Sequence, residues 1–469
     1  MPIVVAWMMI AQTASAAAQL DAGRALEAKS DLQGALTAYQ RAVEVDPDSA
    51  IAHDRLGFVL GRLGRIEEAL AEFARATELD PELFDAHYHL GATRWWRRDL
   101  NGALEPLQTA VQLRPKHAEA QYYLGLTLVQ LERRRDGIER LRRSLELNPN
   151  LAPAHLQLGV ALQRDGDLDG AVLHLQRAVD LDSGAPEALN SLGLALMAKG
   201  DGQKAAAIFR KIAASHPGFP AARLNLATAL MHQGDLAAAV DVLSALTRDE
   251  PRNAEAFYNL GVALKQQDRF EDAERALRRA LALDVSLPDP PFTLGVLVWQ
   301  SGRIEEAETL FRQAIERKQD SAEAHYMRGT VLKQLGRVNE ALGEFKTATQ
   351  LNSEMAEAFV SLAQTLQQQG DEAGARSARA QAERLSRRKA DAQASAFAVS
   401  AGQDRLKKGD RAGAIAQFRE AVRLDSTNAR AHFALALALE QSGAAAEASR
   451  HFDEAHRLAP YLVRPEKKR

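Results

Sequence analysis

The chain has 469 residues, of which 46% are hydrophobic, 26% are charged and only 6% are aromatic, a composition typical of an Ala- and Leu-rich helical protein. Its formal net charge of −3 provides no broad basic field, so we expect no nucleic acid partner. No internal stretch reaches the roughly 20 apolar residues that cross a bilayer, so we expect no integral membrane segment. The absence of cysteine is compatible with either an oxidising or a reducing compartment.

The first 20 residues carry no charged side chain, and residues 3–10 form a compact apolar run. Small residues at 14–16 follow this run as a cleavage motif, although no Lys or Arg precedes it. We therefore predict a signal peptide over residues 1–16 and export to the periplasm or the exterior. In the alternative interpretation these residues form an apolar cap on the first repeat, and the protein stays in the cytoplasm.

From there on, a small residue recurs every 34 residues along almost the whole chain. A second small residue precedes each of these marks by twelve positions, as Gly57 precedes Ala69. A fixed period of this length indicates stacked helical repeats, because one such unit cannot bury its apolar face alone. The marks are Ala35, Ala69, Ala103, Gly137, Ala171, Ala205, Ala239, Ala273, Ala307, Ala341 and Ala375, then Ala414 and Ala448 after five extra residues.

Each unit reads as a helix with Leu-Gly inside it, a turn, a second helix of the form Ala-x-x-x-Phe/Leu, and often a terminating Pro such as Pro81. This pattern resembles the tetratricopeptide repeat, in thirteen tandem units. The resemblance implies an all-α fold, a right-handed α-α superhelix whose first helices line a concave groove. The family's Trp in the first helix is replaced here, mostly by His, as at His53 and His155.

The repeat pattern predicts units 1–11 over residues 17–389, five extra residues at 390–394, units 12 and 13 over 395–462, and a basic tail at 463–469. Before the extra residues, Arg376, Arg379 and Glu383 stand where an earlier unit has Leu70, Phe73 and Thr77. No Pro or Gly interrupts the chain between Gly374 and Gly402. Two interpretations remain open, a long connecting helix and a lengthened turn near residue 390.

The sequence contains no Gly-rich phosphate loop, no His-Glu-x-x-His pair and no Gly-x-Ser-x-Gly elbow. Histidines that recur at one repeat position, such as His53 and His87, lie about a repeat apart and do not converge on one ion. We therefore predict a chain that is not an enzyme, with no catalytic residues, no cofactor and no metal site.

Two aromatic-rich stretches of the first helices stand out as the predicted partner-binding surface. Aromatic side chains provide large contact areas, and a row of glutamines can pair with the backbone of an extended chain. A competing interpretation is that these glutamines are ordinary exposed residues near helix ends. The predicted partner-binding residues are Tyr88, Trp95 and Tyr122 in the first stretch, and Tyr258, Gln266, Phe292, Trp299, Gln300, Tyr326, Gln334 and Gln368 in the second.

These features predict a non-catalytic scaffold that binds an extended peptide or a partner segment in its groove. The alternative is an accessory subunit that tethers a separately encoded enzyme or cell-envelope complex. A free groove should capture unstructured peptides, whereas a dedicated subunit should bring down one folded partner at fixed stoichiometry.

Overall fold

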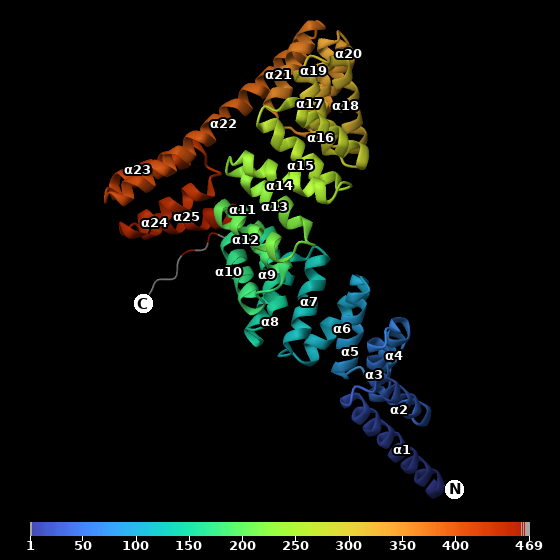
Figure 1. The fold of residues 1–469 in the computed structure, drawn as a ribbon. Coiled ribbons are helices and arrows are strands. Elements are labelled where there is room, and N and C mark those ends of the chain that lie inside the picture. The colour runs from blue at the N-terminus through green and yellow to red at the C-terminus, as the bar shows by residue number, and fades with distance from the viewer. Residues whose placement is uncertain (1, 461, 463, 465–469) are drawn as a thin grey trace. The chain divides into compact units, whose positions relative to one another are not determined.

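The computed structural model of the chain describes residues 2–460, 462 and 464, and it describes side chains from residue 15 onward. In these residues it contains 25 α-helices in tandem and no β-strand (Figure 1). The chain divides into two compact units, residues 1–219 and residues 220–469. The predicted all-α fold of repeated helical pairs is confirmed.

The first compact unit contains six helical pairs. Their bounds are α1 Pro2–Ala28, α2 Leu32–Val45, α3 Ala50–Arg62, α4 Ile66–Leu79, α5 Phe84–Trp96, α6 Leu100–Leu113, α7 Ala118–Gln130, α8 Arg134–Leu147, α9 Ala152–Asp165, α10 Leu168–Leu181, α11 Pro186–Lys199 and α12 Gly202–Ser215.

The second compact unit contains the remaining seven repeats, in thirteen helices. Their bounds are α13 Pro220–His232, α14 Leu236–Asp249, α15 Ala254–Gln266, α16 Phe270–Leu283, α17 Asp289–Gln300, α18 Ile304–Arg317, α19 Ala322–Gln334, α20 Val338–Leu351, α21 Ala356–Gln368, α22 Glu372–Lys407, α23 Arg411–Leu424, α24 Ala429–Gln441 and α25 Ala445–Leu458.

The small residue in each first helix allows the two helices of a pair to approach closely. A Cβ atom added at Gly57 would lie 2.8 Å from the ring of Phe73 on the second helix, and one at Gly91 would lie 2.6 Å from Leu107. A larger side chain would push the helix axes apart and open the core. Contacts between the small first-helix residues and the large residues that they face on the second helix therefore hold each helical pair together.

The turn inside each pair contains one residue with positive φ, in all thirteen repeats. Nine of these residues are glycines, for example Gly64 with φ of 78°. The other four are Ser30, Arg98, Glu132 and Asp268, whose side chains make the left-handed conformation costly. The turn geometry is thus maintained even where the sequence does not favour it.

Within each compact unit, successive first helices touch one another, as α3 touches α5 and α5 touches α7. Second helices pack between the first helices of their own and the next repeat, and successive second helices in the described residues do not make comparable contacts. First helices therefore form the more closely spaced layer, which is the inner layer of a curved stack.

Near the end of the array one helix replaces two. Helix α22 runs unbroken for 36 residues, from the second helix of repeat 11 into the first helix of repeat 12 (Figure 1). Of the two interpretations of residues 390–394, the structure contains the long helix and no turn near residue 390. For this reason thirteen repeats contain 25 helices rather than 26.

At the N-terminus, α1 continues through the predicted cleavage site, and Ala16 is buried within it. At the other end, most of the predicted basic tail lies outside the described residues. Arg464 is described, and its guanidinium lies 5.2 Å from the centre of the Phe452 ring. Among the helices that the structure describes, none is both long enough and apolar enough to cross a membrane.

Candidate protein-binding surface

All eleven predicted partner-binding residues lie on first helices, the inner layer of the stack. Those of the first stretch are on α5 and α7, in the first compact unit. Those of the second stretch are on α15, α17, α19 and α21, in the second compact unit. The structure thus presents two separate candidate surfaces.

The first stretch gathers around one side chain, Tyr123 of α7. The ring centroid of Tyr123 lies 6.1 Å from that of Tyr88, 5.5 Å from that of Trp95 and 5.2 Å from that of Tyr122. The indole N–H of Trp96 donates to the Tyr123 hydroxyl at 3.3 Å. Three of the predicted residues therefore belong to one aromatic cluster, whose centre was not among the predicted residues.

This aromatic cluster is anchored on the core beneath it. Tyr88, Trp95 and Tyr123 are half-buried and pack on a cluster that contains Phe84 and Leu107. Burial raises the pKa of Tyr122 to about 12, with a smaller contribution from Tyr123. These rings are consequently held in place before any partner arrives, so little rotamer entropy would be lost on binding.

The two neighbouring tryptophans have different environments. Trp95 is half-buried, and its ring nitrogen is buried without a hydrogen-bond partner in the described residues. Trp96 is 69% exposed, and it is the largest of the exposed hydrophobic side chains in the described residues. Trp96 therefore presents the more accessible indole.

A pocket of about 470 Å³ adjoins the cluster, between α3 and α5. Its apolar walls come from Phe58, Phe73, Tyr88 and Trp96, and its rim carries Arg62 and Arg97. Arg97 pairs with Glu67 at 2.5 Å, whereas Arg62 has no carboxylate partner in the described residues. The pocket is therefore an apolar cavity with a basic edge.

His89 lines this pocket and is oriented by a buried carboxylate. Its Nδ1 atom lies 2.7 Å from Oδ1 of Asp54, which is only 2% exposed. Its ring lies 5.2 Å from that of Phe58 and 5.5 Å from that of Tyr88. Because Asp54 holds Nδ1, Nε2 is the ring nitrogen that remains for a ligand.

The aromatic residues of the second stretch pack mainly within their own repeats. Phe292 lies 5.8 Å from Phe311, and Tyr326 lies 6.0 Å from Phe345, on the second helices of the same pairs. The indole N–H of Trp299 donates to Gln334 at 2.8 Å. The structure thus links Trp299 to the glutamine row but does not gather these rings into one cluster.

The glutamine row is exposed, and each member is the last residue of its helix. Gln266, Gln300, Gln334 and Gln368 end α15, α17, α19 and α21. Their positions suit either interpretation of the sequence. Whether they bind a partner remains a prediction.

The recurring histidines serve the connections between repeats. His53 and His155 are buried, and Nε2 of each lies close to the carbonyl oxygen of a proline six residues earlier, at 3.0 and 3.1 Å. Gln121 occupies the same repeat position and donates to the carbonyl of Pro115 at 3.0 Å. Among the described residues no group of three or more His, Asp or Glu side chains is arranged to hold a metal ion.

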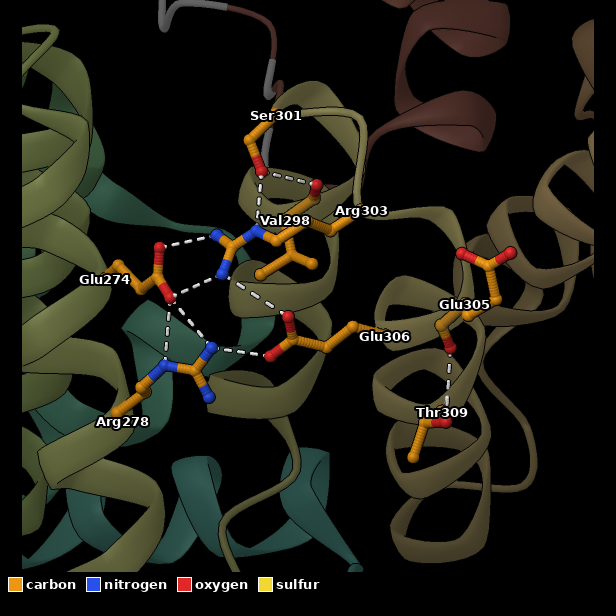
Figure 2. Close-up of polar contacts among 8 residues, drawn as sticks. All are labelled: Glu274, Arg278, Val298, Ser301, Arg303, Glu305, Glu306 and Thr309. Atoms are coloured by element: carbon orange, nitrogen blue, oxygen red, sulfur yellow. Dashed lines mark hydrogen bonds and ion pairs between the residues drawn. The ribbon is translucent and has the colours of Figure 1, made fainter.

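The second helices carry ion pairs instead of aromatic clusters. Figure 2 shows Glu274 of α16 between Arg278 and Arg303, with Glu306 of α18 beside both arginines. Arg303 Nη2 donates to Glu274 at 2.6 Å, and these hydrogen bonds lower the pKa of Glu274 to about 2. This network joins two successive repeats on the outer layer, so its role is to bind neighbours within the stack.

Comparison with known proteins supports the repeat assignment. Residues 23–64, 62–95 and 402–443 match the family model of the TPR repeat. Residues 147–360 match the model of the cilia and flagella-associated protein 70 C-terminal domain. No curated protein matches the chain.

Solved structures also match the chain. YrrB, described as a TPR protein with an unusual peptide-binding site, is 27% identical over 39% of this chain and 95% of its own, with a TM-score of 0.36. PilF of Pseudomonas aeruginosa is 20% identical over 44% of this chain and 95% of its own, with a TM-score of 0.40. A chain of the Cut9–Hcn1 complex is 15% identical over 94% of this chain and 92% of its own, with a TM-score of 0.37.

Proposed function

Because the chain is a tetratricopeptide-repeat protein, we propose that it is a scaffold that holds a segment of a partner protein on its first helices. The proposed role is binding rather than catalysis. The principal contact is the Tyr123 cluster together with the adjoining pocket between α3 and α5.

One observation carries this proposal, the exposure of Trp96 beside a preformed pocket. Trp96 is 69% exposed while it touches Tyr123 and lines the pocket. Trp, Tyr and Arg are the residue types that contribute most to binding at protein interfaces, above all when rigid and desolvated by the partner. The exposed indole of Trp96, which contacts Trp95 and Tyr123, is therefore well placed to bind a partner.

The chemistry of the pocket defines the segment that it would accept. Its apolar walls suit a bulky hydrophobic or aromatic side chain, and Nε2 of His89 can accept one hydrogen bond at the wall, since Nδ1 donates to Asp54. An extended segment crossing α3, α5 and α7 would place such a side chain in the pocket and neighbouring residues over Tyr123 and Tyr122.

The test is to compare partner capture by the wild-type chain and by Trp96→Ala. We expect capture to weaken by about 1–2 kcal/mol, while the melting temperature hardly changes because Trp96 is exposed. The matched control is Leu173→Ala on α10, which removes a side chain of similar exposure, 67%, from a second helix. Equal losses in both variants, or none in Trp96→Ala, would disprove the proposed site.

We further propose that the protein is exported, with residues 1–16 removed as a signal peptide. The uncharged apolar run followed by small residues supports this proposal. Cleavage after Ala16 would leave residues 17–28 of α1 to form the first helix of the first repeat. N-terminal sequencing of the protein from its native host tests it: a mature chain that begins at Ala17 is expected, and a chain that retains residues 1–16 in the cytoplasmic fraction would contradict export.

A further inference from the structure

Repeat 11 lacks the side chain that fills the core of every other repeat. In those twelve repeats the second helix places a buried Phe, Leu or Tyr against the small residue of the first helix, and in repeat 11 this position is Arg379. The twelve residues are Tyr39, Phe73, Leu107, Leu141, Leu175, Phe209, Leu243, Leu277, Phe311, Phe345, Phe418 and Phe452.

Arg379 does not occupy the place of these residues. It is exposed, and its guanidinium donates to Gln367 at 2.9 Å. A groove of about 570 Å³ therefore opens between α21 and α22, with apolar walls that include Val360, Ala363 and Ala382. The groove lies where other repeats have a solid core.

The same helix is also uncovered at the edge of the groove and beyond it. Residues 386–390 of α22 are all exposed, although they lie in the middle of a helix. Phe397 is 76% exposed, at a position where repeat 2 has the fully buried Ala52 and repeat 3 has Ala86. In those repeats the first helix packs on the second helix of the preceding repeat, as α3 packs on α2, but in α22 these two helices are continuous. The continuous helix thus lacks one helix–helix interface, and Phe397, which would lie in that interface, is exposed to solvent.

The uncovered stretch is strongly basic. Between residues 376 and 389 there are six Arg or Lys residues and one acidic residue, Glu383. Arg376 and Arg388 have carboxylate partners, whereas Arg384, Arg387 and Lys389 have none among the described residues. Arg379 and Arg387 border the groove itself, together with Glu383.

The charge argues against a second copy of this chain as the occupant. A two-fold antiparallel pairing that set Phe397 of one copy at residue 379 of the other would be centred on residue 388. Arg388 would then face Arg388, and Arg387 would face Lys389. Like charges placed directly opposite one another disfavour such a contact.

We propose that the groove at α21–α22 is a second binding site, which takes an acidic amphipathic helix of a partner protein. A Leu or Phe of that helix fills the place that Arg379 leaves empty, and its Asp or Glu residues face Arg384, Arg387 and Lys389. We expect a helix because the continuous α22 lacks the helix–helix contact that joins repeats elsewhere in the chain. This site is independent of the Tyr123 cluster, which lies in the other compact unit.

The test uses the full chain and a fluorescein-labelled amphipathic peptide with Leu on one face and Glu on the other. Its length is about 14 residues, close to that of the helices in each repeat. Fluorescence anisotropy should show binding of this peptide, and substitution of its Glu residues by Lys, or of its Leu residues by Ala, should weaken binding about tenfold or more. Equal binding of the Lys peptide or the Ala peptide would overturn the proposal.

Two protein variants make the test specific. Arg379→Phe introduces a Phe, as found at this position in several other repeats. It should raise the melting temperature and weaken binding of the peptide about tenfold or more. The double variant Arg384→Glu, Arg387→Glu should weaken binding of the peptide without changing the melting temperature. Trp96→Ala is the control and should leave peptide binding unchanged. A lower melting temperature of Arg379→Phe, or unchanged binding in both variants, would overturn the proposal.

Discussion

At the scale of single residues, the environment of a side chain decides between structure and binding. Trp95 and Trp96 are adjacent in sequence, yet one is packed on the core and the other is 69% exposed. Tyr123 joins them to Tyr88 and Tyr122 across two repeats. The sequence predicted the aromatic stretch from the fifth, twelfth and thirteenth positions of the repeat, and it missed Tyr123 and His89 because both stand at the sixth.

The left-handed turn residues give a direct prediction of stability. Glu132 has φ of 60° where nine other repeats have Gly, and it is exposed. Glu132→Gly should therefore raise the free energy of unfolding by about 0.5–1 kcal/mol, because glycine adopts this conformation without steric cost. Chemical denaturation measures the change. Gly166→Ala, in the equivalent turn with φ of 90°, should lower the stability, and the opposite order would contradict the turn argument.

Paired histidines predict a loss of stability in mild acid. Nδ1 of His155 lies 3.0 Å from Nδ1 of His174, and burial lowers the pKa of both below its ordinary value. Because the carbonyl of Pro149 can only accept, Nε2 of His155 carries a proton, and its Nδ1 accepts from His174. The folded state thus disfavours protonation, so stability is complete above the unfolded pKa of about 6.5 and is lost as the pH falls below it.

We expect His174→Gln to reduce the slope of melting temperature against pH between about pH 7.5 and 5, since glutamine does not titrate. The slope should not vanish, because burial also lowers the pKa of His451 in a similar pair with His432. The exposed His456→Gln is the control. A slope that His174→Gln leaves unchanged would show that this pair does not govern the acid response.

At the scale of elements, the repeats were predictable because their period is carried by contacts that every pair needs. Small residues such as Gly57 and large ones such as Phe73 determine the packing of each pair locally, so their spacing reveals the helices. The end of repeat 11 was only partly predictable. Arg379 indicated a weakened interface. The sequence could not decide between a turn and a continuous helix, because the Arg379 side chain is in water in both.

Helix α22 should therefore be less protected than its neighbours. Residues 386–390 are exposed throughout and have no packed face, although Arg388 pairs with Glu354 at 2.8 Å. In native-state hydrogen exchange these amides should exchange faster than those in the middle of α20, whose Phe345 and Ala348 are buried. Protection equal to that of α20 would show that something covers this part of α22.

At the scale of the whole molecule, the chain comprises two compact units that meet in sequence at Phe219 and Pro220. The sequence predicted one irregularity in the repeats, at residues 390–394. It did not predict the division at residue 219, because the 34-residue period continues through it unchanged. The Tyr123 cluster lies in the first unit, and the α21–α22 groove lies in the second. A scaffold of this kind gains avidity when two modest sites engage one partner or assembly.

The central claim is that a partner lies on the first helices of the first compact unit. The most direct test is photocrosslinking in the native host with a benzophenone amino acid. It replaces either Ala92, which lies on α5 and lines the pocket, or the exposed Leu173 on the second helix α10. The account predicts a discrete adduct from residue 92 that disappears in Trp96→Ala, and none from residue 173. An adduct from residue 173 with none from residue 92 would contradict it.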